Sequence, residues 1–322
     1  MGYAYLGVFQ ALEERGLRPA LMSGSSIGAV VSAFRCRQES FDSKVVADVV
    51  KDLTWTQLFR PISTEARYGL PAPLRLYIRE GIGRHFLRPD GQPMRVNDLA
   101  IPLLVTIAGI RQGETPHAPE WYEHRLDLDG GPLPTKLGLN TARRLITGLW
   151  RTLADFIEHP ERLRSLVVGA EPGTGEFDLL DAIGFSSAVP AVIHYDILRE
   201  DPRMERLLDE LFDRLSISRL IDGGLSDNVP ARAAWQAVQS GRIQSRNALI
   251  VALDAFAPKL TSPLWIPIQR LAQANVRRNL RYAHMVQTFT RTLSPLERDE
   301  PAAFIHPDRC SWGRPGAYGT AS

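Results

Sequence analysis

The chain has 322 residues, of which 44% are apolar and 23% are charged, and its formal net charge is +2. These proportions are typical of a globular protein with a large core. The mild charge and the lack of a basic run argue against nucleic-acid binding. The seven histidines and two cysteines show no metal-ligand spacing, so no metal or cofactor is expected.

Helices and strands are expected to alternate along the chain, which predicts an α/β fold with a mostly parallel central sheet covered by helices on both faces. Catalytic residues then belong at the carboxyl ends of strands. Helices are expected over residues 5–15, 28–36, 42–53, 143–158, 203–215, 231–240 and 267–293. Strands are expected over residues 102–110, 165–169, 217–222 and 248–254.

The first informative segment follows the first predicted helix and has the pattern G-x-S-x-G. Apolar residues on both sides predict a short strand, a sharp turn and a helix, with the hydroxyl of Ser26 raised above the sheet. We expect that a side chain at Gly24 or Gly28 would crowd the turn and the helix packed beside it. Ser26 is interpreted as a nucleophile, and the alternative is an ordinary turn of small residues.

A second informative segment joins a predicted strand end at Asp222 to a helix start at Pro230. Gly223 and Gly224 allow a sharp turn and leave the Asp222 carboxylate unshielded. Proline suits a first helical turn, where its missing N–H costs nothing. By itself, Asp222 reads as a local cap of a D-G-G turn.

Together these segments resemble the patatin-like phospholipase family, which carries G-x-S-x-G, A-S-S-A-x-P, D-G-[GA] and N-x-P in this order. The corresponding segments here are 24–28, 180–191, 222–224 and 228–230. The resemblance covers most of residues 2 to 60, 94 to 115 and 175 to 256.

The resemblance implies a Ser–Asp dyad that hydrolyses fatty acyl esters of phospholipids or related lipids. Ser26 would attack the ester and Asp222, 196 residues later, would accept its proton. A carboxylate can act as this base if it is poorly solvated. The rival arrangement is a Ser–Asp–His triad, with Asp222 or Asp254 and one of two histidines, His284 or His306.

Members of the family begin with an apolar strand and a G-G-G-x-R-G loop that supplies oxyanion-hole donors. Gly2 matches the last glycine of that loop, and the preceding part is not in this sequence. We expect an upstream coding stretch that contains it. The alternatives are an inactive relative that binds lipid or a protein partner, or another segment that supplies the donors. The backbone N–H of Ile27 is expected to provide one donor.

The domain prediction is a patatin-like catalytic domain over 1–256, with an insertion at about 113–165, and a C-terminal helix and loosely ordered tail over 257–322. The basic helix at 267–293 is expected to pack on the sheet, and contact with anionic lipid headgroups is the alternative. Cys36 and Cys310 are interpreted as free thiols. A cytoplasmic or membrane-surface location is expected, an upstream signal is left open, and the oligomeric state is not indicated.

Overall fold

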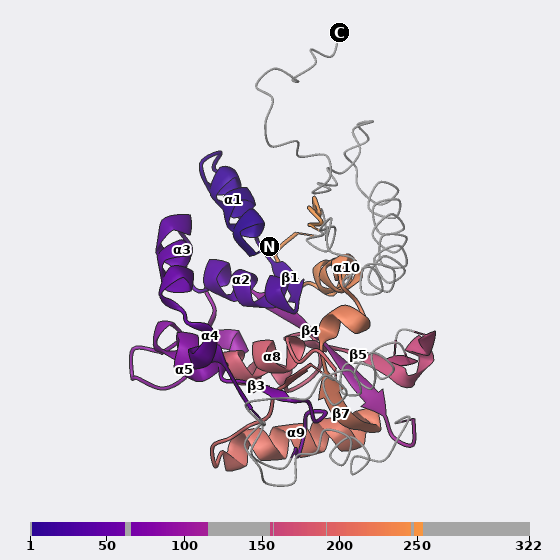
Figure 1. Cartoon of the computed structure of the whole chain (residues 1–322). Coiled ribbons are helices and arrows are strands. Elements are labelled where there is room, and N and C mark those ends of the chain that lie inside the picture. The colour runs from indigo at the N-terminus through magenta and orange to yellow at the C-terminus, as the bar shows by residue number, and fades with distance from the viewer. Residues whose placement is uncertain are drawn as a thin grey trace.

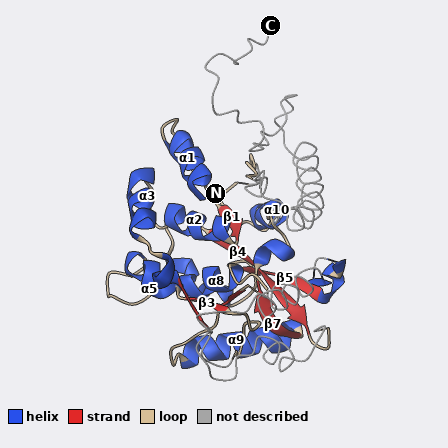
Figure 2. Ribbon diagram, viewed as in Figure 1, coloured by secondary structure: helices blue, strands red, loops and turns tan. Residues whose placement is uncertain are grey.

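β4 (Leu103–Arg111) is the central strand of the main sheet and pairs with three other strands (Figure 1). Its first eight residues are buried, as expected of a central strand covered on both faces. The computed structural model describes residues 2–61, 66–114, 155–156, 158–190, 192–245 and 248–253. Within this part the chain has an α/β fold, with helices on both sides of the strands (Figure 2).

The remaining elements follow the chain. The strands are β1 (Met22–Ser25), β2 (Phe59–Pro61), β3 (Leu74–Leu76), β5 (Leu163–Val168), β6 (Ile193–His194) and β7 (Ile217–Ile221). The α-helices are α1 (Gly2–Glu13), α2 (Ile27–Cys36), α3 (Ser43–Asp52), α4 (Trp55–Leu58), α5 (Ile78–Ile82), α8 (Leu179–Ser186), α9 (Pro202–Leu215) and α10 (Ala231–Gln239). Short 3₁₀ turns are η1 (Gly83–His85), η2 (Val96–Asp98), η3 (Pro160–Arg162), η4 (Thr174–Glu176) and η5 (Gly223–Leu225).

The direction of the strands corrects the prediction of a mostly parallel sheet, which is not confirmed. Among the described strands, β1 runs parallel to β4, whereas β5 and β7 both run antiparallel to it. β5 and β7 run antiparallel because of the end of β4 at which the chain re-enters the sheet. Both β5 and β7 begin beside the carboxyl end of β4, so each must run back along it. Alternation of helices and strands predicts their order but not this direction.

Alternate residues of β4 pack into different cores, because successive side chains of a strand point to opposite faces. On one face, Leu103, Val105 and Ile107 join the main core with residues of α2, α8 and α9. On the other face, Leu104 packs against Ala233 and Ala237 of α10. The prediction of helices on both faces of the sheet therefore agrees with the described residues.

Most of the predicted helices lie where expected, because their ends carry clear signals. Asp42 accepts a hydrogen bond from the Lys44 N–H at the start of α3. Asp201 does the same for Met204 at the start of α9, whose first residue is Pro202. The strands of the small second sheet, β2–β3–β6, have two or three residues each, too few for a period-2 pattern to reveal.

Two predicted boundaries need correction. The strand expected over residues 165–169 begins two residues earlier, at Leu163, and ends at Val168. The strand expected over 248–254 is not confirmed, because residues 248–252 lie in no strand and Leu249 is 75% exposed. An apolar run of this length does not specify a pairing partner. The predicted insertion, apart from a few described residues at its ends, and the whole of 257–322 lie outside the described residues.

Candidate active site

β1 and β7 meet end to end along one edge of β4. β5 occupies the opposite edge over Val105–Ile110, so β1 and β7 must share the edge that remains. β1 runs in one direction and ends with Ser25 beside Thr106, and β7 runs in the other and ends with Ile221 beside Ala108. The next residues of the two strands, Ser26 and Asp222, therefore converge at the middle of the sheet.

Ser26 occupies a strained turn between β1 and α2. Its backbone angles are φ 51° and ψ −130°, an unusual combination for a residue that carries a side chain. Conformations of this kind cost about 1–3 kcal/mol and persist only where the surrounding structure enforces them. The turn matches the sharp strand-to-helix geometry that the G-x-S-x-G pattern predicts.

The Ser26 hydroxyl donates a hydrogen bond of 2.7 Å to Oδ2 of Asp222. The other carboxylate oxygen, Oδ1, accepts a hydrogen bond of 2.7 Å from the backbone N–H of Gly224. The backbone N–H of Asp222 donates in turn to the carbonyl of Ala188, at 2.8 Å. Asp222 is thus fixed at its backbone and at one oxygen, and the second oxygen faces the serine.

Burial changes the acidity of Asp222. Only 6% of the residue is exposed, and loss of solvent raises the pKa of its carboxyl group to about 6. The hydrogen bonds from Ser26 and Gly224 act in the opposite direction, because they favour the charged carboxylate, but they do not outweigh burial. A carboxylate with a raised proton affinity beside a hydroxyl is suited to accept a proton from it.

A family model described as patatin-like phospholipase matches residues 1–235, which include both Ser26 and Asp222. The chain belongs to the patatin-like phospholipase family. This membership agrees with the α/β fold and supports hydrolysis of lipid acyl esters as the general activity of the family. No curated protein matches the chain.

Glycines allow the close approaches at this patatin-like site, with one exception. A Cβ on Gly24 would lie 2.8 Å from the backbone nitrogen of Ala29, and a Cβ on Gly223 would overlap the carbonyl of Thr106. The expectation for Gly28 is wrong, because a Cβ there meets no atom of the described residues within 4 Å. Gly28 lies in the first turn of α2 and faces open space, whereas Gly24 is pressed against the helix.

This difference predicts opposite effects of two alanine substitutions. Gly24→Ala is expected to destabilise the protein by about 1–3 kcal/mol, because the elbow backbone must move. Gly28→Ala is expected to be neutral or stabilising by up to about 1 kcal/mol. It lowers the entropy of the unfolded chain, and the added methyl group meets no clash in the helix. Urea unfolding of both variants measures the difference, and equal losses of stability would contradict the geometry.

The N-terminus of α2 presents backbone donors beside Ser26. Ala29 and Val30 donate to the Ser26 carbonyl, and in the described part of the chain no acceptor is found for the N–H of Ile27 or Gly28. Free N–H groups and the positive end of a helix dipole favour a developing negative charge. Gly2 is the first residue of α1, and its assignment to the oxyanion hole remains a prediction.

The rival triad cannot be evaluated from the described residues, because Asp254, His284 and His306 all lie outside them.

Cys310 lies outside the described residues too, while Cys36 is a free, buried thiol whose pKa is raised by burial. The described residues contain no cluster of histidine, cysteine and acidic side chains that would hold a metal ion. Among the helices in those ranges, none has the length and apolar character needed to cross a membrane.

Sequence reasoning missed the part played by α8. The first turn of this helix carries Asp181, which is fully buried and accepts hydrogen bonds from Arg79, Arg199 and the Tyr195 hydroxyl. Burial opposes ionisation of Asp181, but the two guanidinium groups outweigh it and lower its pKa. The last residue of the helix, Ser186, contacts Ser26. The only signal in the sequence was a small-residue helix end stopped by a proline.

The raised pKa of Asp222 predicts a pH-dependent loss of stability. The carboxyl group titrates near 3.8 in the unfolded chain and near 6 in the folded protein, so the folded state binds more protons between these values. Stability therefore falls as pH rises through this window, by about 3 kcal/mol in all. Asp222→Asn is expected to remove this fall. Thermal unfolding from pH 4 to 8 measures it, and parallel curves for the two proteins would contradict it.

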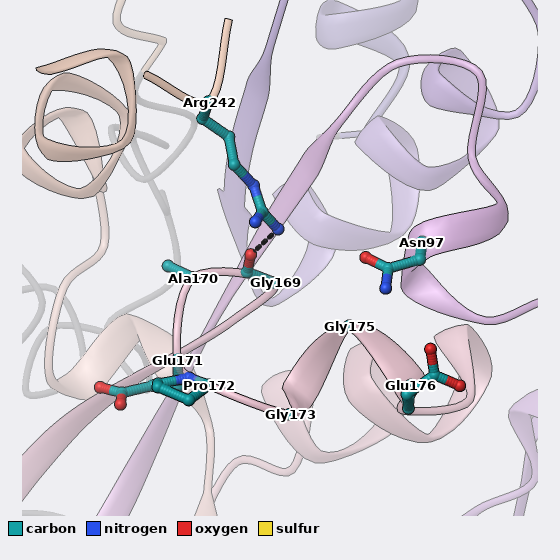
Figure 3. Close-up of a pocket in the computed structure, with 9 residues that line it drawn as sticks. All are labelled: Asn97, Gly169, Ala170, Glu171, Pro172, Gly173, Gly175, Glu176 and Arg242. Carbon is teal, nitrogen blue, oxygen red and sulfur yellow. Dashed lines mark hydrogen bonds between the residues drawn. The ribbon is translucent and has the colours of Figure 1, made fainter. Parts of the chain in front are cut away.

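A separate hollow of about 320 Å³ lies beside the turn that follows β5. Arg242 reaches from one side to the carbonyl of Gly169, while the amide of Asn97 faces the hollow from the other (Figure 3). Its lining also contains Glu171 and Glu176 but neither Ser26 nor Asp222. No serine, cysteine or histidine is among the lining residues, so this hollow lacks the groups that ester chemistry needs.

Proposed function

We propose that this protein is a serine acyl hydrolase that cleaves fatty acyl esters of phospholipids or related lipids through a Ser26–Asp222 dyad. The observation that carries the proposal is the 2.7 Å hydrogen bond from the Ser26 hydroxyl to the buried Asp222 carboxylate. Membership of a lipid-hydrolysing family supports the substrate class. Neither the identity of the lipid nor the acyl position is part of the proposal.

The proposed reaction has two halves. Oγ of Ser26 bonds to the ester carbonyl carbon while Oδ2 of Asp222 accepts the hydroxyl proton. The carbonyl oxygen becomes an oxyanion, which the N–H groups at the start of α2 are placed to stabilise. The C–O bond to the alcohol then breaks, and the alcohol leaves with the proton from Asp222. An acyl group remains on Ser26.

Water completes the cycle in the same geometry. Asp222 accepts a proton from a water molecule as the water oxygen attacks the acyl carbonyl. The ester bond to Ser26 breaks, the proton returns to Oγ, and the fatty acid is released. Among the described residues, the space at Gly28, two residues after Ser26, is open and gives the ester and the water a place to approach.

The acyl-enzyme is the species that tests this proposal. The protein is mixed with a short-chain aryl ester, quenched in acid and analysed by mass spectrometry, with release of fatty acid from phospholipid vesicles followed in parallel. We expect the mass of the acyl group on the peptide that contains Ser26, because the intermediate is covalent. Binding of lipid without adduct or fatty acid release would instead indicate an inactive relative that binds lipid.

A further inference from the structure

The hydroxyl of Ser186 joins the Ser26 turn to the central strand. Ser186 is the last residue of α8 and is completely buried. Its Oγ accepts a hydrogen bond of 2.9 Å from the backbone N–H of Ser26 and donates one of 2.7 Å to the carbonyl of Thr106. The hydroxyl therefore acts as an acceptor towards the residue that follows β1 and as a donor towards β4.

The Ser186 hydroxyl lies where the next backbone hydrogen bond between β1 and β4 would form. The N–H of Met22 donates to the carbonyl of Pro102, and donors along a parallel strand recur every second residue. With the observed register, the N–H of Ser26 is therefore the donor due to meet the carbonyl of Thr106. The Ser186 hydroxyl is instead hydrogen-bonded to both of these groups and bridges them.

We propose that Ser186 is a positioning residue, whose hydroxyl replaces one rung of the β1–β4 ladder and thereby sets the backbone of Ser26 so that its Oγ meets Asp222. The departure from the ladder occurs at the residue that takes a positive φ. A direct hydrogen bond from the N–H of Ser26 to the carbonyl of Thr106 would draw Ser26 towards β4 and away from this conformation. The catalytic consequence of the inference rests on the proposed function, whereas the structural consequence does not.

The same segment also holds the second member of the dyad. Two residues after Ser186, the carbonyl of Ala188 accepts the N–H of Asp222. The other end of α8 is fixed by Asp181 between two arginines. A helix anchored in this way is a rigid reference for both functional side chains. Because one element contacts both residues, a small error in its contact with Ser26 changes the distance between Oγ and the carboxylate.

Two neighbouring serines provide a matched test. Ser187 follows directly, and its buried Oγ has no hydrogen-bond partner among the described residues. For hydrolysis of a short-chain aryl ester, Ser186→Ala is expected to lower kcat by about 10²-fold with little change in KM, since a misplacement of about 1 Å costs that much. Ser187→Ala is expected to stay within about twofold of the wild type. Equal kcat values for the two variants would overturn the proposal.

Hydrogen exchange provides a readout that does not depend on activity. The Ser26 amide is expected to exchange about tenfold faster or more in Ser186→Ala than in Ser187→Ala, because its acceptor is lost. If kcat falls while exchange at Ser26 is unchanged, the hydroxyl does not hold the turn and the proposal is wrong. Should Ser186→Ala fail to fold, Ser186→Cys replaces it, since a thiol fills the site but is a weak donor and acceptor.

The two proposals fail in different ways. A folded wild-type protein with no Ser26-dependent turnover would overturn the proposed function. Exchange at the Ser26 amide alone would then decide whether Ser186 holds the turn. A wild-type protein with Ser26-dependent turnover, together with indifference of both kcat and exchange to Ser186→Ala, would overturn only the positioning role.

Discussion

Replacing Ser26 with alanine is expected to lower kcat for hydrolysis of a short-chain aryl ester by roughly 10⁴- to 10⁶-fold, the scale seen when a serine hydrolase loses its nucleophile. No other hydroxyl is hydrogen-bonded to Asp222 in the described part of the chain. Labelling by a fluorophosphonate is expected to disappear in the same variant, because an activated hydroxyl attacks phosphorus as it attacks a carbonyl carbon. Rates and labelling are measured on folded protein.

Ser25 is the matched control for this substitution. It is adjacent to Ser26, but its hydroxyl donates to the carbonyl of Asn228, at 3.2 Å, rather than to a carboxylate. Ser25→Ala is therefore expected to keep fluorophosphonate labelling. Labelling that survives Ser26→Ala and disappears in Ser25→Ala would show that the wrong serine has been assigned.

Replacing Asp222 with asparagine is expected to lower kcat by about 10²- to 10⁴-fold, the usual contribution of a general base. The amide keeps the shape of the side chain but cannot accept the serine proton. In the wild type the base is active only when ionised, so the rate should rise with pH through about 6, where the buried carboxyl group titrates. The residual rate of the variant should lack this rise. A pH–rate profile of both proteins measures the two effects.

Two histidine variants separate the dyad from a triad. His284→Ala and His306→Ala are each expected to leave the rate and its pH dependence unchanged if Asp222 is the base. If either variant abolishes hydrolysis and Asp222→Asn does not, a histidine supplies the base and the dyad is wrong. The rise of rate with pH would in that case follow the imidazole rather than the carboxyl group.

The pairing of Ser26 with Asp222 was implied by the family resemblance, and each end of the contact also carries a local signal. G-x-S-x-G predicts a turn that raises a serine, and D-G-G predicts a turn that exposes a carboxylate. What the patterns do not contain is the route by which the residues meet. A mostly parallel sheet was expected, whereas β1 and β7 approach the site from opposite directions along β4.

The residues that support the dyad were harder to predict, because their roles depend on contacts distant in sequence. Ser186 and Ser187 are adjacent serines with the same sequence surroundings. The hydroxyl of Ser186 joins Ser26 to Thr106, whereas that of Ser187 has no described hydrogen-bond partner. Ser186 is the last residue of α8, whereas Ser187 is the C-cap that follows it and has left the helical conformation. Likewise, Gly24 and Gly28 are both glycines of one motif, and only Gly24 is sterically constrained.

The end-to-end meeting of β1 and β7 has a consequence for biosynthesis. Synthesis proceeds from the N-terminus, so the candidate nucleophile emerges from the ribosome early, whereas the carboxylate follows 196 residues later. Until β7 has been translated and paired with β4, the serine hydroxyl has no base, and the nascent chain carries an inert turn. If Ser26 and Asp222 act as the proposed dyad, reactivity towards lipids therefore requires that nearly the whole family domain has been made.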